Sequence, residues 1–342
     1  MKQSSPNPAR IMEVGLGFWA SKTLLAAVKL GLFTFLDGGA RSADDVRVAL
    51  GLHGRTVVDF LDALLSLGFL ERDGAGTTAR YRNTADTGAF LVKGNPQYVG
   101  GFLEMANDRE YRFWADLEEG LRTGQPQNEI RTTGKESFDA IYGDPARLKQ
   151  FTEAMSSIQI GAFAAFAEHF DFSKHRLMLD VGGSGATLSS LVARRHPQMR
   201  CISYDMPLLE PLAKEACARS GVADRVEILS GNFFADPLPT ADLVTMGNIL
   251  HSFDLSKKEL LLRKAYDALP DGGELAVIEL ILDDERRSNT LGLLLSLNML
   301  IESDGGFNFT FAEFTGWATA AGFRAVRLLP LAGPTSAAIA VK

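Results

Sequence analysis

The chain has few residues of the kinds that cross-link a fold or hold a metal ion. Its 342 residues include two cysteines, Cys201 and Cys217, and five histidines. The cysteines lie sixteen residues apart and no His-x-x-x-His spacing occurs, so the sequence predicts no metal site. Because cysteine is rare and the N-terminus does not read as a secretory leader, we expect a reducing compartment, the cytoplasm.

An excess of positive charge is also lacking. Lysine and arginine total 35 against 42 aspartates and glutamates, a formal net charge of −7. Phosphate contacts need concentrated basic side chains, so we expect no nucleic-acid partner. The apolar stretch after residue 10 is interrupted by Glu13, Lys22 and Lys29, and we expect no membrane partner. A Walker loop and a Gly-x-Ser-x-Gly elbow are absent as well,.

What is present is typical of a soluble globular protein of more than one domain. The hydrophobic fraction is 46% and the charged fraction 23%, both ordinary values. A length of 342 residues exceeds the usual size of one domain. The sequence pattern predicts segments 1–96, 97–172 and 173–342, the second being helical with a polar connection at residues 120–134.

The first segment has the pattern of a winged helix. Residues 11–36 are helical and apolar on most faces, which favours burial against a second copy of the chain. Ser42 is typical of a helix N-cap, and residues 55–67 predict another helix. Residues 69–72 and 79–82, on either side of a glycine-rich turn, predict a β-hairpin. We therefore expect a homodimer formed through this segment.

A winged helix has two interpretations. One is DNA binding, and the other is a dimerisation module that also covers the substrate site. The candidate recognition helix carries Arg55, Asp59 and Asp62, which do not form a basic stripe. Because phosphate binding requires such a stripe, the sequence favours the dimerisation module.

After residue 176 the pattern alternates between strands and helices. This alternation predicts an α/β domain with a mostly parallel, Rossmann-like sheet and helices on both faces. The expected fold is therefore this α/β domain preceded by an all-α, winged-helix dimerisation domain. The expected strands are residues 176–180, 200–205, 226–229, 241–246 and 275–279.

A glycine loop follows the first of these strands. Gly182, Gly183 and Gly185 come directly after Asp180 and before a helix, where glycine lets the backbone turn sharply near a ligand. The second strand ends at Asp205, 25 residues after Asp180, which suits hydrogen bonding to ribose hydroxyls. The third strand leads to the amide and aromatic pair Asn232-Phe233. In this order the three features predict a nucleoside-containing cofactor.

These features alone leave a nicotinamide dinucleotide as an alternative. The loop continues as Ser-Gly-Ala-Thr after Gly182 and Gly183, which departs from the dinucleotide fingerprint. A methyltransferase loop has to hold only a nucleoside and an amino-acid tail, with no pyrophosphate. The spacing therefore favours a methyltransferase.

The fourth and fifth strands lead to a candidate acid–base pair. His251 lies just after the fourth strand, at the edge of the sheet where such folds bind ligands. Imidazole is the natural general base at neutral pH. Glu279 ends the fifth strand and is expected to orient the imidazole. The remaining histidines are interpreted as surface or helix-end residues: His53, His169, His175 and His196.

The motifs taken together resemble a known family. A winged-helix half is followed by Asp-Val-Gly-Gly-x-x-Gly and then by "YDMP", "GNFF", "GNILHSFD", "DGGELAVIE" and "NMLIESDGG". This order is similar to the S-adenosylmethionine-dependent small-molecule O-methyltransferases of the caffeate and acetylserotonin type, which bacteria use in natural-product tailoring, a part of secondary metabolism. The similarity runs from about residue 11 to the end of the chain.

The resemblance implies roles for residues around the cofactor, S-adenosylmethionine. Gly182 and Gly183 would hold its methionine tail, and Asp205 its ribose. Met206 would pack against the adenine. The resemblance also implies adenine contacts for Asn232 and Phe233, although the family usually has an acid in place of Asn232. It implies a cofactor position for Gly247, where plant members often have lysine.

It also implies roles on the acceptor side, where the substrate would be a small aromatic molecule. His251 matches the catalytic base and Glu279 the first supporting acid. The implied substrate-binding residues are Phe151, Met155, Asn298, Met299 and Asn308. Phe307 is a further expected pocket residue.

Two positions depart from the family pattern. Ser252-Phe253 follows the histidine in place of Asp-Trp, and Asn308 replaces the second supporting acid. Three hypotheses follow: O-methylation of a phenol, C-methylation of an aromatic ring or a 2-oxo acid, and a winged-helix regulator that binds a ligand without catalysis. The complete cofactor pattern and the acidic net charge favour an enzyme over the regulator.

Overall fold

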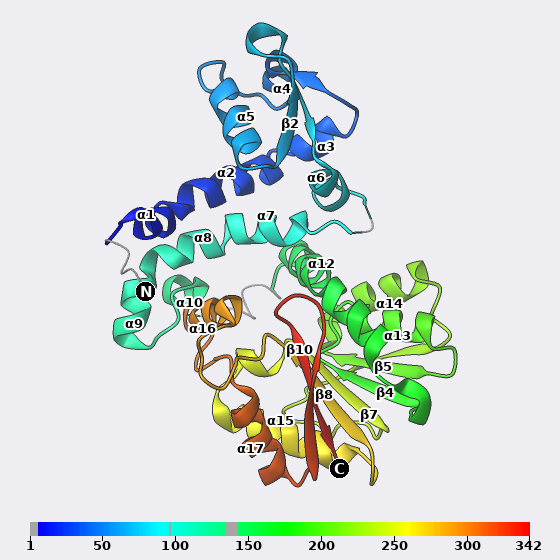
Figure 1. The fold of residues 1–342 in the computed structure, drawn as a ribbon. Coiled ribbons are helices and arrows are strands. Elements are labelled where there is room, and N and C mark those ends of the chain that lie inside the picture. The colour runs from blue at the N-terminus through cyan, green and yellow to red at the C-terminus, as the bar shows by residue number, and fades with distance from the viewer. Residues whose placement is uncertain (1–5, 96, 135–142) are drawn as a thin grey trace, which may run out of the picture. The chain divides into compact units, whose positions relative to one another are not determined.

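The chain forms two compact units in the computed structural model, which describes residues 6–95, 97–134 and 143–342 (Figure 1). The units are Met1–Arg112 and Phe113–Lys342. The division falls inside the segment 97–172 that the sequence pattern groups together, and the assignment of that segment to the substrate pocket stays a prediction.

The first unit is helical with a small sheet. Its sheet has the order β1-β3-β2, and all pairs are antiparallel. Its elements are α1 (Ala9–Gly15), α2 (Gly17–Lys29), α3 (Leu32–Leu36), β1 (Arg41–Ser42), α4 (Ala43–Ala49), α5 (Val57–Ser66), β2 (Leu70–Asp73), η1 (Gly76–Thr78), β3 (Arg80–Asn83), α6 (Ala85–Phe90), α7 (Gly100–Asp108) and α8 (Glu110–Phe113), of which α8 crosses the division.

The predicted winged helix is present in this unit. Strands β2 and β3 form the expected hairpin, with Arg72 opposite Tyr81. Ser42 caps α4 in a capping box with Asp45, which satisfies the first backbone N–H groups of that helix. The expected single helix over residues 11–36 is wrong, because the chain turns at Leu16 and at Gly31, where φ is +77°.

The stretch Ala9–Lys29 is long and apolar enough to cross a bilayer by length and composition, with a mean hydropathy of 1.3. It consists of two helices, α1 and α2, and 17% of its residues are buried within the unit. The core helix of a soluble protein and a signal sequence near an N-terminus pass the same test, so this is weak evidence of a membrane span. The buried residues Ala27 and Val28 belong to the hydrophobic core of the unit.

The second unit is built on a seven-stranded sheet of order β6-β5-β4-β7-β8-β10-β9. Strands β4 to β8 pair in parallel, and β10 is antiparallel to both of its neighbours. The strands are β4 (Leu177–Val181), β5 (Arg200–Asp205), β6 (Val226–Ser230), β7 (Leu243–Gly247), β8 (Glu274–Glu279), β9 (Ala325–Pro330) and β10 (Ser336–Val341).

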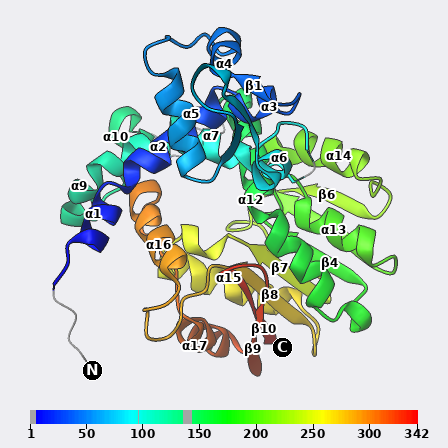
Figure 2. The same cartoon turned by 45° about the horizontal axis from the view of Figure 1, so that its top comes forward.

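Helices cover both faces of this sheet. One face packs on α12 (Pro145–His169), α13 (Thr187–Arg195) and α14 (Glu210–Arg219), and the other on α15 (Leu255–Ala268) and α17 (Phe311–Ala321) (Figures 1 and 2). Alternate strand residues supply the two cores, because neighbouring side chains point to opposite faces. The connecting elements are η2 (Trp114–Asp116), α9 (Leu117–Thr123), α10 (Glu129–Thr133), η3 (Phe172–Lys174), η4 (Pro207–Leu209), η5 (Leu250–Ser252) and α16 (Thr290–Glu302).

Two features of this unit differ from the sequence-based expectation. The polar connection predicted at residues 120–134 contains the end of α9 and all of α10. Gly124 and Gly134 end these helices in the left-handed region, so the glycines that indicated a loop are helix C-caps. Strands β9 and β10 were not predicted, since β10 reads Ser-Ala-Ala-Ile-Ala-Val and alanine is a poor indicator of strand.

His175 is buried at the end of η3, so it is a helix-end residue but not a surface residue. Its side chain is 3% exposed and its Nε2 lies 3.0 Å from Glu274 Oε2. Arg327 pairs with the other Glu274 oxygen at 2.9 Å. Burial raises the pKa of Glu274, but the hydrogen bond from His175 and the charge of Arg327 outweigh it, so the net pKa is lowered. The cluster joins the start of β8 to the segment before β4 and to β9.

Glu274→Gln is expected to lower the free energy of unfolding at pH 7 by about 1–3 kcal/mol, because it weakens a charge-assisted hydrogen bond to a buried partner. A carboxylate whose pKa is lowered by folding stabilises the protein above its unfolded pKa and stops doing so as the pH falls through its folded pKa. Denaturant titrations should therefore show a difference in the free energy of unfolding between wild type and variant that is smaller below pH 4 than at pH 7. Glu227→Gln, at an exposed position on β6, is the control. An equal decrease in its free energy of unfolding would refute a specific stabilising role for the hydrogen bond between Glu274 and His175.

Candidate active site

The glycine loop joins β4 to α13 in a tight left-handed turn. Gly182 has φ of +73°, and a Cβ at this position would overlap the side chain of Ile249. Ser184 and Ala186 also have positive φ, of 48° and 54°, which is costly for residues other than glycine. The turn brings the loop against the segment that follows β7, the segment that carries His251.

Asp205 closes this loop from the end of β5. Its Oδ2 accepts the N–H of Ser184 at 2.8 Å, and its Oδ1 accepts the N–H of Met206 at 2.7 Å. Burial raises the pKa of Asp205, and the two N–H groups act in the opposite direction. A carboxylate has about four acceptor positions, so Asp205 keeps capacity for the hydroxyl groups of a ligand.

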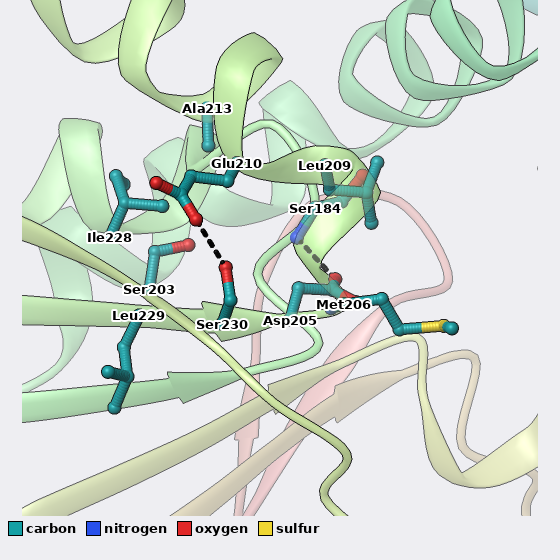
Figure 3. A pocket seen from close by; sticks show the side chains of 10 residues that line it. All are labelled: Ser184, Ser203, Asp205, Met206, Leu209, Glu210, Ala213, Ile228, Leu229 and Ser230. Atoms are coloured by element: carbon teal, nitrogen blue, oxygen red, sulfur yellow. Dashed lines mark hydrogen bonds between the residues drawn. The ribbon is translucent and has the colours of Figure 1, made fainter. Parts of the chain in front are cut away.

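A small hollow surrounds Asp205 (Figure 3). Met206 and Ser184 line it, and the Ser230 hydroxyl donates to Glu210 at 2.7 Å on its wall. Met206, expected to pack against the adenine, is part of this lining, whereas Asn232 and Phe233 lie outside it. Asn232 is exposed and its amide oxygen accepts the N–H of Phe234, while the Phe233 ring packs on Phe234 and Phe253. An adenine contact at Asn232 and Phe233 stays a prediction.

Asp180, at the end of β4, supports the loop from beneath. Its carboxyl accepts hydrogen bonds from Thr245 at 2.9 Å and Ser189 at 3.1 Å, and it is buried. Burial raises its pKa to about 7 despite these hydroxyls, and the charge of Asp205 acts in the same direction as burial. Asp180 therefore fixes β4 to β7 and α13 rather than facing solvent.

His251 and Glu279 form the predicted pair. The imidazole Nδ1 lies 3.2 Å from Glu279 Oε2, and the backbone N–H of His251 donates to Glu279 Oε1 at 3.2 Å. The histidine is 7% exposed and the glutamate 0%. Glu279 therefore holds both the ring and the main chain of His251, in the turn η5 directly after β7.

Helix α12 covers the loop with residues that the sequence analysis did not single out. A Cβ at Gly185 would lie 3.1 Å from the Thr152 methyl and 3.3 Å from the Ser156 hydroxyl. Thr187 donates to Ser156 at 2.9 Å. The spacing of Thr152 and Ser156, four residues apart in a helix, places them on one face and was the available signal. The predicted pocket residues Phe151 and Met155, half-buried, belong to this helix.

Phe163 of the same helix explains an unusual glycine. A Cβ at Gly247 would lie 2.6 Å from the Phe163 ring, so the aromatic ring takes the space that a side chain at this position would need. A lysine, common here in plant members of the family that the sequence resembles, would not fit without displacing Phe163. Gly247 thus contributes close packing between β7 and α12.

The expected acceptor residues lie on α16 and the segment after it. Asn298 accepts a hydrogen bond from the Trp114 indole at 2.7 Å, and Met299 is buried. Asn308 is 1% exposed and donates to the Leu280 carbonyl at 3.1 Å, while its own amide oxygen has no partner. Asn308 therefore anchors the chain directly after Glu279, and the structure shows no bond from it to His251.

Phe307, a further expected pocket residue, is half-buried, and its place in a pocket stays a prediction. Its ring packs under the Lys258 ammonium, with the nitrogen 3.3 Å from the ring centroid, and against Trp317. Lys258 belongs to α15 and Trp317 to α17, the two helices that pack on the same face of the sheet. The aromatic character at this position therefore serves packing behind the His251 turn.

The residues at this edge of the sheet fit S-adenosylmethionine. A half-buried carboxylate at the end of β5 suits ribose hydroxyls, and the left-handed loop lets a ligand approach the backbone closely,. Asp205 is the charged group at the hollow that faces the loop, and Glu210 lies beside it. This acidic lining suits a nucleoside and disfavours the pyrophosphate of a dinucleotide.

Comparisons with known proteins agree with this arrangement. The O-methyltransferase domain model matches residues 114–324, and the O-methyltransferase dimerisation domain model matches residues 12–93. The chain is 38% identical to the tetracenomycin polyketide synthesis 8-O-methyl transferase of Streptomyces glaucescens, over 98% of this chain and 97% of the relative. It is 35% identical to the 3-hydroxy-5-methyl-1-naphthoate 3-O-methyltransferase of Streptomyces sahachiroi, over 96% and 92%.

A solved structure shows the same fold. Human N-acetylserotonin methyltransferase in complex with S-adenosylmethionine superimposes with a TM-score of 0.91 and 28% identity, over 100% of this chain and 99% of that one. The comparisons confirm the predicted fold class, enzyme class and cofactor. The chain belongs to the S-adenosylmethionine-dependent O-methyltransferases that carry an N-terminal dimerisation domain.

Proposed function

We propose that this enzyme methylates a phenolic hydroxyl of a small, fused-ring aromatic natural product, with His251 as the general base. The observation that carries the proposal is the buried pairing of His251 with Glu279 beside the glycine loop. The relatives' names support the acceptor class, since they describe methylation of a tetracenomycin polyketide and of a hydroxynaphthoate.

The pairing sets the direction of proton transfer. A carboxylate only accepts hydrogen bonds, so Nδ1 of His251 carries a hydrogen and donates to Glu279. Nε2 then has a lone pair for the phenolic proton, and Glu279 compensates the positive charge that forms on the ring. S-Adenosylmethionine, when bound, supplies a sulfonium methyl whose carbon–sulfur bonding pair returns to sulfur as the new oxygen–carbon bond forms.

Alignment of the acceptor contributes most of the rate. Positioning two reactants supplies on the order of 7–11 kcal/mol, and a general base about 10²–10⁴-fold. Helix α12, with Phe151 and Met155, and α16, with Asn298 and Met299, would supply the acceptor walls. Their partly apolar side chains suit an aromatic ring.

Product analysis tests this proposal. The protein is incubated with methyl-labelled S-adenosylmethionine and a panel of hydroxynaphthoates, hydroxyquinones, simple phenols, indoles and 2-oxo acids, and products are identified by mass spectrometry and NMR. A methyl group at an oxygen-bound shift on a fused-ring phenol supports it. A carbon-bound methyl group would instead support C-methylation. That reaction is compatible with an asparagine, Asn308, in place of the second supporting acid.

We also propose that the enzyme acts as a homodimer through the first unit. The relevant side chains are apolar and largely exposed on α1 and α2, and they include Phe18 packed edge-on against Trp19. Exposed apolar groups of this extent are typical of an interface. They are Ile11, Met12, Val14, Phe18 and Trp19.

Trp19→Glu is expected to convert the protein from dimer to monomer in light scattering after gel filtration at micromolar concentration. A charge placed in an apolar contact costs its desolvation, and the large contact area of the indole is lost. Val48→Glu, at another exposed apolar position of the same unit, should stay dimeric. Dimers formed equally by the Trp19 variant would place the interface elsewhere.

A further inference from the structure

Helix α12 places two hydroxyl side chains over the glycine loop. The Thr152 methyl lies 3.1 Å from the position that a Cβ would take at Gly185, and the Ser156 hydroxyl lies 3.3 Å from it. The hydroxyl of Thr187, at the start of α13, donates to Ser156 at 2.9 Å. Helices α12 and α13 pack side by side (Figures 1 and 2), so this face of α12 is fixed against the loop.

The Thr152 hydroxyl is buried without a hydrogen-bond partner. Thr152 is 5% exposed, and its Oγ1 has no partner among the residues that the structure describes. An unpaired buried hydroxyl is costly, and such groups are rare in native proteins. Ser156, the other hydroxyl of this face, already pairs with Thr187. Thr152 therefore offers its donor to a ligand at the loop.

The N-terminus of α13 lies at the same place. This helix spans nine residues and begins after Ala186, which has φ of 54° and supplies no side-chain cap. The first N–H groups of a helix have no partner within the helix, and the helix dipole makes this end positive. An uncapped N-terminus is therefore suited to an anion, and Gly185 separates it from Thr152 by a close contact only.

The strand order indicates which end of S-adenosylmethionine reaches this place. The hollow around Asp205 lies at the ends of β5 and β6, and His251 follows β7. Strand β4 lies between β5 and β7 in the sheet. With the nucleoside at Asp205 and the methyl group directed to His251, the amino-acid end is the part left to meet the loop after β4, α12 and α13. This assignment of ends rests on the proposed positions of ribose and base.

We propose that the Thr152 hydroxyl, together with the N-terminus of α13, binds the carboxylate at the amino-acid end of S-adenosylmethionine. A threonine hydroxyl donates one hydrogen bond, and a carboxylate only accepts. Such a charge-assisted bond is roughly twice as strong as a bond between neutral groups. Thr152 is therefore a binding residue that favours nucleosides carrying this carboxylate over those that lack it.

Thr152→Val tests this, because it removes the hydroxyl and keeps a side chain of the same shape. By isothermal calorimetry the variant should bind S-adenosylhomocysteine, the demethylated product, about 10–100-fold more weakly than the wild type does, since a hydrogen bond to a charged group is lost. Methylthioadenosine, which lacks the amino-acid end, should bind both proteins equally. Decarboxylated S-adenosylmethionine, which keeps the ammonium and lacks the carboxylate, should also bind both equally.

Two further variants serve as controls. Thr152→Ser keeps the hydroxyl and should retain most of the affinity for S-adenosylhomocysteine. Ser157→Ala changes a residue of the same helix whose hydroxyl donates to the Ala154 carbonyl at 2.7 Å, and it should leave binding of every ligand unchanged.

Three outcomes in Thr152→Val would overturn the proposal. An equal loss for all the ligands would show a structural role, and no loss for S-adenosylhomocysteine would place its carboxylate elsewhere. A loss that persists with the decarboxylated cofactor would assign the contact to the ammonium. Asp205→Ala should weaken methylthioadenosine as well, so a misplaced ribose is recognised separately.

Gly185→Ala covers the case in which Thr152→Val does not fold. Its added Cβ would lie so close to Thr152 and Ser156 that α12 would have to shift by a few tenths of an ångström. Affinity for S-adenosylhomocysteine should then fall while that for methylthioadenosine stays the same, and any other result would refute the contact. These measurements need no acceptor, so failure of this proposal is distinguished from failure of the proposed methyl transfer.

Discussion

His251→Ala is expected to bind S-adenosylmethionine with unchanged affinity while kcat falls by about 10²–10⁴-fold, the usual contribution of a general base. The imidazole lies after β7 with its Nδ1 on Glu279, and His251 is not one of the residues that line the hollow around Asp205. The variant therefore removes the proton acceptor and leaves the cofactor residues in place.

The pH dependence sharpens this test. The residual activity of His251→Ala should follow the ionisation of the phenol itself, because no side chain then accepts the phenolic proton. Activity of the variant would then rise steadily with pH toward the pKa of the acceptor. Steady-state rates with two phenols of different acidity would show this, since the more acidic phenol should lose less.

The control replaces another histidine. His169→Ala alters an exposed residue at the end of α12 and should keep full activity. Because His251→Ala leaves Glu279 buried without its ring partner, thermal unfolding should accompany the kinetics. A folded His251→Ala enzyme with kcat within about threefold of the wild type would eliminate the histidine as base.

Asp205→Ala is expected to weaken S-adenosylmethionine binding by more than about 100-fold. The carboxylate holds the Ser184 and Met206 N–H groups and, in our proposal, the ribose hydroxyls. Each hydrogen bond to a charged group contributes about 1.5–3 kcal/mol, and 1.4 kcal/mol corresponds to a tenfold change in affinity. Isothermal calorimetry with the cofactor and with its demethylated product measures the loss directly.

Asp205→Asn offers a graded comparison, because the amide keeps one acceptor and loses the charge. Its affinity should fall between those of the wild type and the alanine variant. Asp224→Asn changes an exposed aspartate in the turn before β6 and should have no effect. Affinity of Asp205→Ala within threefold of the wild type would show that the ribose is held elsewhere.

The raised pKa of Asp205 adds a consequence for pH. Burial favours its neutral form, so the carboxylate takes up a proton at a higher pH than a solvated aspartate as the solution is acidified. Since only the charged form makes charge-assisted bonds to hydroxyls, cofactor affinity should decrease earlier in acid than a normal aspartate would predict. Asp205→Asn should remove this pH dependence.

Much of the cofactor site could be predicted because its residues lie next to strand ends. A parallel sheet brings the carboxyl ends of its strands to one edge, so Asp205, His251 and Glu279 could be placed together from the alternating pattern alone. The contact between His251 and Glu279 followed from the same rule, and the structure confirms it at 3.2 Å.

Other residues of the site depend on contacts between distant segments. Phe163 fills the space at Gly247, and Thr152 and Ser156 cover Gly185, but the spacing of these residues shows only that they share a face of α12, not that this face packs on the loop. Phe307 has the aromatic character of a pocket residue, and the structure instead places it under Lys258. A side chain that is apolar in the sequence can face either a pocket or a core.

The sequence by itself determined the order of winged helix and α/β domain, the glycine loop after β4 and the pairing of His251 with Glu279. Periodicity and strand ends can be identified from local sequence, and in a parallel sheet the residues that follow the strand ends lie together at one edge. Only the tertiary structure decided that His175 is buried, that Asn308 holds the Leu280 carbonyl and that Phe307 packs under the Lys258 ammonium. Burial and charge pairing arise between segments far apart in the chain, so they depend on how those segments pack.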